Sequence, residues 1–254
     1  MLQVDLRGKR ALITGASGEL GRVMATTLAR CGADIVVHFH SNSASALLVC
    51  QSVEALGRRA LAIRADVGSP ADIQALAAQI ETELGGVEIV VANAVEQIFP
   101  WRTVLETPLD SYTSQFNSCV MQNVLLAKAF IPGMQRRGWG RYIGINTECT
   151  MQMKVTQSAY VSGKRGMDGL MRVLAREVGP TGITVNQVAP GWTISESQRN
   201  NPPDDANYVA EIPLRRRGTD QEIANVVAFL ASDLASYVHG AFIPVTGGNV
   251  MPTV

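Results

Sequence analysis

Tyr160 and Lys164 are the residues whose types and spacing point most directly to chemistry. They lie four positions apart, and on a helix this spacing puts both side chains on one face, with roughly 6 Å of axial rise between them. A neighbouring ammonium group favours the phenolate and lowers the pKa of a tyrosine. Such a tyrosine can exchange a proton with a substrate oxygen. The same spacing also occurs by chance on solvated helix faces, so the rest of the chain must decide between the two interpretations.

A second chemical signal is the glycine-rich turn near the start of the chain. Residues 10–14 predict a short buried strand, and residues 22–31 have the apolar spacing of a helix. Glycines in the turn between them would let the backbone approach a pyrophosphate, whose charge is favoured by the N–H groups at a helix start. We therefore expect a dinucleotide to bind there, at Gly15, Ser17, Gly18, Leu20 and Gly21.

The end of the second expected strand bears on the choice of cofactor. An acidic residue at this position would bind the ribose hydroxyls of NAD, but residues 38–42 contain none. The polar run His40, Ser41 and Asn42 could instead receive a 2′-phosphate, which favours NADP and keeps NAD as the alternative, because no Arg or Lys stands there. In a second interpretation these three residues only form a turn and cap the next helix.

Strand and helix patterns alternate along the whole chain, with no linker and no repeat. The expected strands cover 10–14, 34–39, 59–64, 88–92, 141–146, 183–188 and 242–245, and the expected helices 22–31, 43–56, 71–84, a long segment within 105–134, 158–178 and 220–230. This alternation predicts an α/β fold, a doubly wound parallel sheet with helices on both faces, in a single domain over residues 1–254. The polar stretch 193–217 predicts a mobile loop near the site.

Composition argues against several classes of protein. The 22 basic and 22 acidic residues balance, so no charge excess suggests a nucleic-acid partner. The apolar runs are too short to span a bilayer and the N-terminus lacks the pattern of a signal peptide, so we expect no membrane association and a cytoplasmic location. The four cysteines show no CxxC spacing, which favours free thiols over disulfides or a metal site.

Taken together, the motifs resemble one family over nearly the whole chain: the short-chain dehydrogenases/reductases, and within it the 3-oxoacyl-carrier-protein reductase branch. The matching residues are Thr14-Gly15 to Gly21, Asp66-Val67, Asn93-Ala94, Tyr160 with Lys164, Val185-Asn186, Pro190-Gly191 and Val245 to Gly248. The resemblance implies a seven-stranded sheet, a nicotinamide cofactor and a homo-oligomer, usually a tetramer, with a dimer as the alternative. It also implies interconversion of a carbonyl and a secondary alcohol, on a small-molecule substrate such as a 3-oxoacyl thioester or another small ketone.

The resemblance also assigns roles to residues. Tyr160 would be the general acid/base, Lys164 would lower its pKa and hold the nicotinamide ribose, and Thr147 would stand where the family has a serine that steadies the carbonyl. Further cofactor contacts would come from Asp66, Val67, Asn93, Pro190, Gly191 and Thr193. The substrate pocket would be lined by Glu148, Gln152, Met153 and Trp192, although Glu148 could equally be a loop carboxylate that faces solvent. Arg136, Arg137 and Arg176 resemble the patch with which some relatives bind an acyl carrier protein.

Four positions depart from the family pattern and keep an alternative open. Glu19 stands where the turn usually has a glycine, and we expect its carboxylate to turn outward. Val95 replaces a usual glycine, Thr147 replaces the serine, and Cys119 replaces an asparagine that normally holds a water behind the lysine. We expect Cys119 to be a small buried hydrophobe, with Asn117 and Asn123 as candidate substitutes for the asparagine. The alternative function is a binding or regulatory protein with reduced catalysis on the same scaffold.

Overall fold

The protein is built around one parallel sheet. The structure, a computed structural model, describes residues 3–96, 98–195, 198 and 205–251. The strand order is β3-β2-β1-β4-β5-β6-β7, and every neighbouring pair is parallel. The strands are β1 (Arg10–Ile13), β2 (Asp34–Phe39), β3 (Ala60–Arg64), β4 (Ile89–Ala92), β5 (Gly140–Ile145), β6 (Ile183–Pro190) and β7 (Phe242–Val245). The predicted doubly wound α/β fold is confirmed.

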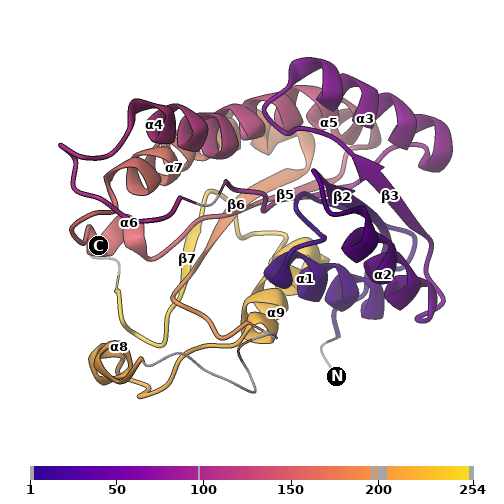
Figure 1. Ribbon diagram of the computed structural model, residues 1–254. Helices are drawn as coiled ribbons and strands as arrows, with labels where there is room; N and C mark the ends of the chain where they lie inside the picture. Colours follow the sequence, from indigo (N-terminus) through magenta and orange to yellow (C-terminus); the bar gives the residue numbers. More distant parts are fainter. Residues whose placement is uncertain (1–2, 97, 196–197, 199–204, 252–254) are drawn as a thin grey trace.

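Helices cover both faces of this sheet (Figure 1). One face carries α1 (Glu19–Arg30), α2 (Ser43–Glu54) and α9 (Asp220–Ala231). The other carries α3 (Pro70–Leu84), α5 (Gln122–Arg137) and α7 (Ser158–Val178), with α4 (Leu109–Phe116) packed against α7. In the described part of the chain, no helix combines the length and the apolar character that crossing a membrane requires.

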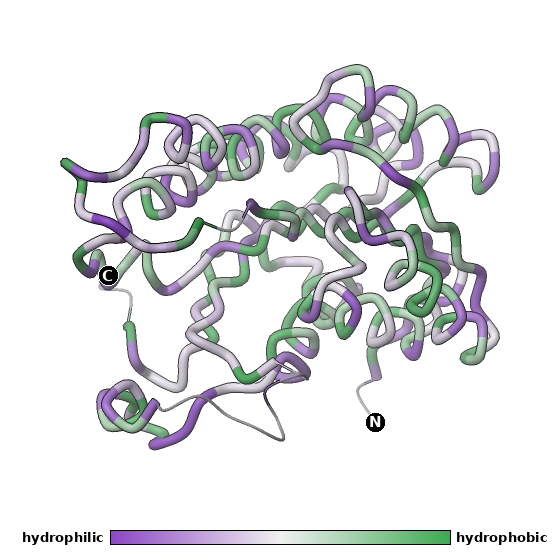
Figure 2. The backbone as a smooth tube through the Cα atoms, in the orientation of Figure 1, coloured by the Kyte–Doolittle hydropathy of each residue, from purple (hydrophilic) through white to green (hydrophobic). Residues whose placement is uncertain are grey.

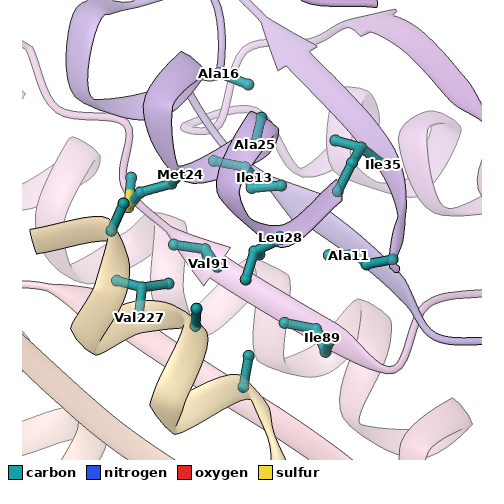
Figure 3. Close-up of a cluster of buried hydrophobic side chains, with 14 of the residues drawn as sticks. Ala11, Ile13, Ala16, Met24, Ala25, Leu28, Ile35, Ile89, Val91 and Val227 are labelled. Carbon is teal, nitrogen blue, oxygen red and sulfur yellow. The ribbon is translucent and has the colours of Figure 1, made fainter. Parts of the chain in front are cut away.

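The strands supply two hydrophobic cores because alternate side chains point to opposite faces of the sheet. Ala11 and Ile13 of β1 pack in the core under α1 and α9, whereas Leu12 packs in the core under α3, α5 and α7. Figure 3 shows the first of these cores, where Leu28 of α1 lies beside Val91 and Ile89 of β4. In Figure 2 the hydrophobic colour accordingly follows the central strands. Burial on both faces explains why the strand sequences read as continuous apolar runs.

The structure differs from the sequence-based expectations in three places. The long helix expected within 105–134 is three segments, α4, a π-helical turn η1 (Asn117–Met121) and α5. A short helix α6 (Cys149–Gln152) follows β5, and α8 (Ala206–Glu211) lies in the stretch expected to be a loop. Both are too short to leave a periodic apolar pattern in the sequence. Residues 196–197 and 199–204 of the expected loop lie outside the described residues, so its mobility stays a prediction.

Candidate active site

The carboxyl ends of the strands open into one cleft of about 990 Å³. It lies at the topological switch point of the sheet. There β2 and β4 lie on opposite sides of β1, so the strand order reverses. The predicted residues that line it are Gly15, Ser17, Gly18, Leu20, Gly21, His40, Ser41, Asn42, Asp66, Val67, Asn93, Thr147, Tyr160, Lys164, Pro190 and Gly191. Thr193 lies outside this lining. Segments far apart in the sequence therefore meet in one elongated site.

The glycine turn after β1 has the geometry of an anion cradle. Gly15 has a φ of +64°, and a Cβ added at Gly21 would lie 2.2 Å from the Gly15 carbonyl oxygen. Helix α1 begins at Glu19 with Gly18 as its N-cap, which has no side chain to accept the first N–H groups. The backbone and the helix start can therefore approach a pyrophosphate, so the turn fits a dinucleotide. Glu19 contributes to the cleft lining, and the outward orientation expected for its carboxylate stays a prediction.

His38, at the end of β2, holds this turn in place. Its Nδ1 accepts a hydrogen bond from the Gly15 N–H at 3.0 Å, and its Nε2 lies 3.1 Å from the Ala65 carbonyl oxygen. The two contacts require a neutral ring with its proton on Nε2. The side chain is fully buried, and this burial lowers the pKa of His38 from 6.5 to about 4. Sequence reasoning gave His38 no role, although its place at the strand end was a usable signal.

His38 predicts a specific loss of stability in acid. Because its folded-state pKa lies below the unfolded value of about 6.5, its contribution is complete above that pH and is lost as the pH falls towards 4. The shift corresponds to about 3 kcal/mol of unfolding free energy. Urea unfolding of the wild type and of His38→Gln, which cannot titrate, should show a stability difference that shrinks as the pH falls. A difference that is constant with pH would contradict this assignment.

The three residues expected to choose the cofactor lie at the open end of the cleft. Asn42 caps α2, since its Oδ1 accepts the Ser45 N–H at 3.0 Å, so the helix-capping interpretation holds for this residue. His40 and Ser41 are exposed and line the cleft. The sequence showed no cation here, but β3 brings one: Arg64 Nε donates to the His40 carbonyl oxygen at 3.0 Å. A guanidinium group therefore stands beside the polar run.

At the other end, Tyr160, Lys164 and Thr147 come together. Tyr160 and Lys164 lie on α7, and the Lys164 ammonium is 5.9 Å from the centre of the Tyr160 ring. Thr147, just after β5, lines the cleft beside Tyr160, and its side chain lowers the pKa of that tyrosine. The buried ammonium donates to the Ile145 carbonyl oxygen at 2.6 Å. A hydroxyl, a phenol and an ammonium thus share the inner end of the cleft.

Burial sets the protonation of this group. It raises the pKa of Tyr160 and lowers the pKa of Lys164, because the charged form of each loses solvation. The Thr147 side chain acts in the opposite direction on the pKa of Tyr160 but is the smaller effect. The expected lowering of the Tyr160 pKa by Lys164 is therefore not met, because burial dominates. The result is a neutral phenol, which can donate a proton at physiological pH.

A buried polar chain fixes the catalytic groups against the sheet. Asp168 of α7 accepts from Gln187 Nε2 at 2.8 Å, and Gln187 Oε1 accepts from Asn146 Nδ2 at 2.7 Å. Asn146 in turn accepts the Thr147 N–H at 2.9 Å and donates to the Lys164 carbonyl oxygen at 3.1 Å. Polar groups buried in this way are stable only when mutually bonded. This row of hydrogen-bonded side chains therefore links the backbones of Thr147 and Lys164.

Cys119 lies in the π-helical turn η1, behind Lys164. It is 1% exposed and packs in the core under α5 and α7, as expected of a small buried hydrophobe. Asn123 donates to the Cys119 carbonyl oxygen at 2.7 Å, and its Oδ1 accepts from the Tyr142 hydroxyl at 3.0 Å, so its amide is engaged away from the lysine. Asn117 lines the cleft instead. All four cysteines are free, which confirms that expectation.

Glu148 has a place that neither sequence interpretation anticipated. It is 3% exposed, so it does not face solvent, and it lies outside the lining of the cleft. Its carboxylate accepts from the Tyr208 hydroxyl of α8 at 2.5 Å and from Asn249 Nδ2 at 3.0 Å. Tyr208 also accepts the Trp192 N–H at 2.7 Å. Through these bonds, Glu148 joins α8, the segment after β6 and the C-terminal segment to the loop after β5 that carries Thr147.

The remaining expected substrate residues do not converge on Tyr160. Trp192 is 43% exposed and packs edge to face on Tyr208, with Arg217 stacked on it at 4.1 Å. Arg217 also donates to the Thr193 carbonyl oxygen. Met153 is exposed, and Gln152 lines neither described pocket. The residues beside Tyr160 come instead from the loop after β4, around Trp101, which the sequence analysis did not single out.

A doubly wound sheet with a glycine-turn cleft, ending at a tyrosine, a lysine and a hydroxyl, defines a nicotinamide-dependent oxidoreductase. Residues 15–249 match the family model described as enoyl-(acyl carrier protein) reductase. The chain is 36% identical to the 3-oxoacyl-[acyl-carrier-protein] reductase FabG of Pseudomonas aeruginosa, over 98% of this chain and 100% of that protein. It therefore belongs to the short-chain dehydrogenase/reductase family, and its reaction class is NAD(P)-dependent interconversion of a carbonyl and an alcohol.

Solved structures agree with this assignment. A 7α-hydroxysteroid dehydrogenase complexed with NADH and 7-oxo glycochenodeoxycholic acid superposes with a TM-score of 0.90 at 30% identity, over 98% of this chain and 97% of that one. L-sorbose reductase from Gluconobacter frateurii, complexed with NADPH and L-sorbose, has a TM-score of 0.90 at 27% identity, over 99% and 100%. None of these similarities favours the alternative of a scaffold with reduced catalysis.

Proposed function

We propose that this protein is an NADP-dependent reductase of ketones in which Tyr160 delivers the proton. The observation that carries the proposal is the convergence of Tyr160, Lys164 and Thr147 at the inner end of a cleft that fits a dinucleotide. A bound nicotinamide would supply the hydride in reduction or accept it in oxidation. The neutral phenol is the form needed to protonate a carbonyl oxygen, so the site can act in the direction of reduction.

Each of the three residues has a distinct task in this proposal. Tyr160 protonates the oxygen of the substrate. Thr147 donates its hydroxyl to the same oxygen and orients the carbonyl, while its β-branch keeps the side chain in few rotamers. Lys164 stabilises the tyrosinate left after proton transfer and would hold the nicotinamide ribose of a bound cofactor. The buried chain from Asp168 to Asn146 holds Thr147 and Lys164 at their distances.

The preference for NADP rests on Arg64, His40 and Ser41. Arg64 supplies a cation beside the polar run, and a guanidinium group binds phosphate well because its charge and hydrogen-bond donors match phosphate oxygens. The test is a fluorescence titration of the purified protein with NADPH and with NADH. We expect NADPH to bind at least about tenfold more tightly, and Arg64→Gln to remove most of that difference without weakening NADH. Equal affinities in the wild type, or tighter binding of NADH, would overturn the preference.

The proposal also includes a class of substrate, a candidate protein partner and a cellular location. A 3-oxoacyl thioester or another small ketone fits the reaction, and the relative in Pseudomonas aeruginosa is a reductase of that first kind. An acyl carrier protein as partner has less support, because Arg137 of the basic run is engaged with Glu88 at 3.2 Å. Four free cysteines fit a reducing compartment, so we retain the cytoplasm as the location.

A homo-oligomer, either a tetramer or a dimer, is part of the proposal. Leu109 and Phe116 of α4 and Val173 of α7 are 83%, 51% and 55% exposed, and α4 packs against α7. Exposed apolar side chains on adjacent helices are typical of surfaces buried between copies of a chain. Light scattering or gel filtration at the monomer mass of 27.2 kDa would contradict this part of the proposal.

A further inference from the structure

A second, smaller pocket lies beside the catalytic tyrosine. Its volume is about 140 Å³, and its apolar wall is formed by Phe99, Pro100, Trp101, Pro108 and the ring of Tyr160. Among the residues that the structure describes, Tyr160 is the one that lines both this pocket and the cofactor cleft. Tyr160 therefore borders both spaces.

The aromatic wall is not needed by the fold. The Phe99 and Trp101 rings lie edge to face at 6.2 Å, and the Trp101 and Tyr160 rings do so at 5.6 Å. Phe99 is 72% exposed and Trp101 36%, and neither belongs to the two hydrophobic cores. Large aromatic surfaces held open to solvent next to a reactive group are typical of ligand pockets. Their geometry offers both ring faces and ring edges to a flat guest.

The volume of the pocket limits the size of the ligand that it can bind. An apolar cavity of about 150 Å³ in a protein binds one benzene molecule, so a pocket of 140 Å³ accepts one six-membered ring and little more. A ring seated against Trp101 lies against the Tyr160 side chain as well, because these two residues share the wall. A carbonyl attached directly to that ring would then be within reach of the tyrosine.

We infer that this pocket binds the aromatic ring of the substrate, and that the enzyme reduces aryl ketones in preference to open-chain ketones. The inference rests on the proposed function and names its substrate class. In the reaction the carbonyl carbon gains a hydride, the C=O double bond becomes a single bond and the oxygen takes the Tyr160 proton. NADPH is oxidised to NADP⁺, and water returns a proton to the tyrosine.

The test compares two ketones that have the same number of carbon atoms, acetophenone and 2-octanone, with NADPH as reductant. We expect the wild type to have a kcat/KM at least about tenfold higher for acetophenone. Trp101→Ala should remove most of this preference by lowering kcat/KM for acetophenone alone, and Trp101→Phe should restore part of it. The control is Leu105→Ala, a fully exposed residue that lines neither pocket and should leave both ketones unaffected.

A second measurement separates this inference from the reaction itself. Binding of acetophenone to Tyr160→Phe, measured by saturation-transfer NMR, does not require turnover, because the variant keeps the ring that walls the pocket. Trp101→Ala in that background should weaken binding about tenfold. Reduction of both ketones without a preference would overturn the inference and leave the proposed function standing. Binding that Trp101→Ala leaves unchanged would also overturn the inference, whereas Trp101-dependent binding without any turnover would support the pocket and contradict the reaction.

Discussion

Tyr160→Phe should lower kcat for ketone reduction by about 10²–10⁴-fold while leaving the affinity for NADPH within about twofold of the wild type. The substitution removes only the hydroxyl, which is the proton donor in the proposed reaction. The ring remains, so the walls of both pockets are preserved. Steady-state turnover together with a fluorescence titration of NADPH measures the two effects separately.

Two variants serve as controls for this result. Tyr237→Phe removes a hydroxyl from a fully exposed tyrosine that lines neither pocket, and it should change neither turnover nor binding. Thr147→Val removes the second hydroxyl at nearly constant shape and should lower kcat, whereas Thr147→Ser should keep much of the activity. Wild-type turnover by Tyr160→Phe would mean that another group supplies the proton, and the proposed mechanism would be wrong.

The second large effect is expected for Gly21→Ala, which should weaken the binding of NADPH strongly. A Cβ there would lie 2.2 Å from the Gly15 carbonyl oxygen and 2.8 Å from the Ala16 Cα. Both are backbone atoms of the turn that would hold the pyrophosphate, so the turn must move. We expect a loss of about 1–3 kcal/mol in unfolding free energy and an affinity for NADPH at least about tenfold weaker. Urea unfolding and the NADPH titration measure these two quantities.

Matched glycine substitutions test whether the cause is steric. At Gly18 the nearest atom to an added Cβ is the Gly15 carbonyl oxygen at 3.3 Å, so Gly18→Ala should be milder than Gly21→Ala in both measurements. At Gly169 of α7 no atom lies within 4 Å, so Gly169→Ala should leave NADPH binding unchanged and raise stability by roughly 0.5–1 kcal/mol. Normal cofactor binding by Gly21→Ala would contradict the assignment of the turn.

The sequence predicted the framework well because the framework depends on periodic burial. The bounds of β2, α7 and β7 agree with the expected ranges 34–39, 158–178 and 242–245. The prediction was poorer where tertiary contacts override local pattern. The π-helical turn Asn117–Met121 interrupts a continuous helical pattern, and α8 is stabilised by the contacts of Tyr208 with Glu148 and Trp192 rather than by its own periodicity.

The site residues, like the fold, could be predicted where a local motif determines them and not where a distant contact does. Residues that belong to local motifs, such as the glycine turn and the pair on α7, could be placed on the cleft from the sequence. His38, Arg64 and Trp101 were not assigned these roles from the sequence, because each acts through a partner distant in the chain: Gly15, the His40 carbonyl group just after the neighbouring strand β2, and Tyr160. The direction of the Tyr160 pKa was also missed, because the degree of burial is not readable from a four-residue spacing.

The central claim is that Tyr160 and a bound nicotinamide together reduce a carbonyl. The most direct measurement uses NADPH carrying deuterium at the transferred position of the nicotinamide, with acetophenone and 2-octanone as substrates and mass spectrometry of the alcohol products. We expect one deuterium on the carbinol carbon with the wild type, and at least about 10²-fold less labelled alcohol in the same time with Tyr160→Phe. Alcohol formed without the label, or equal amounts of labelled alcohol from both proteins, would contradict the account.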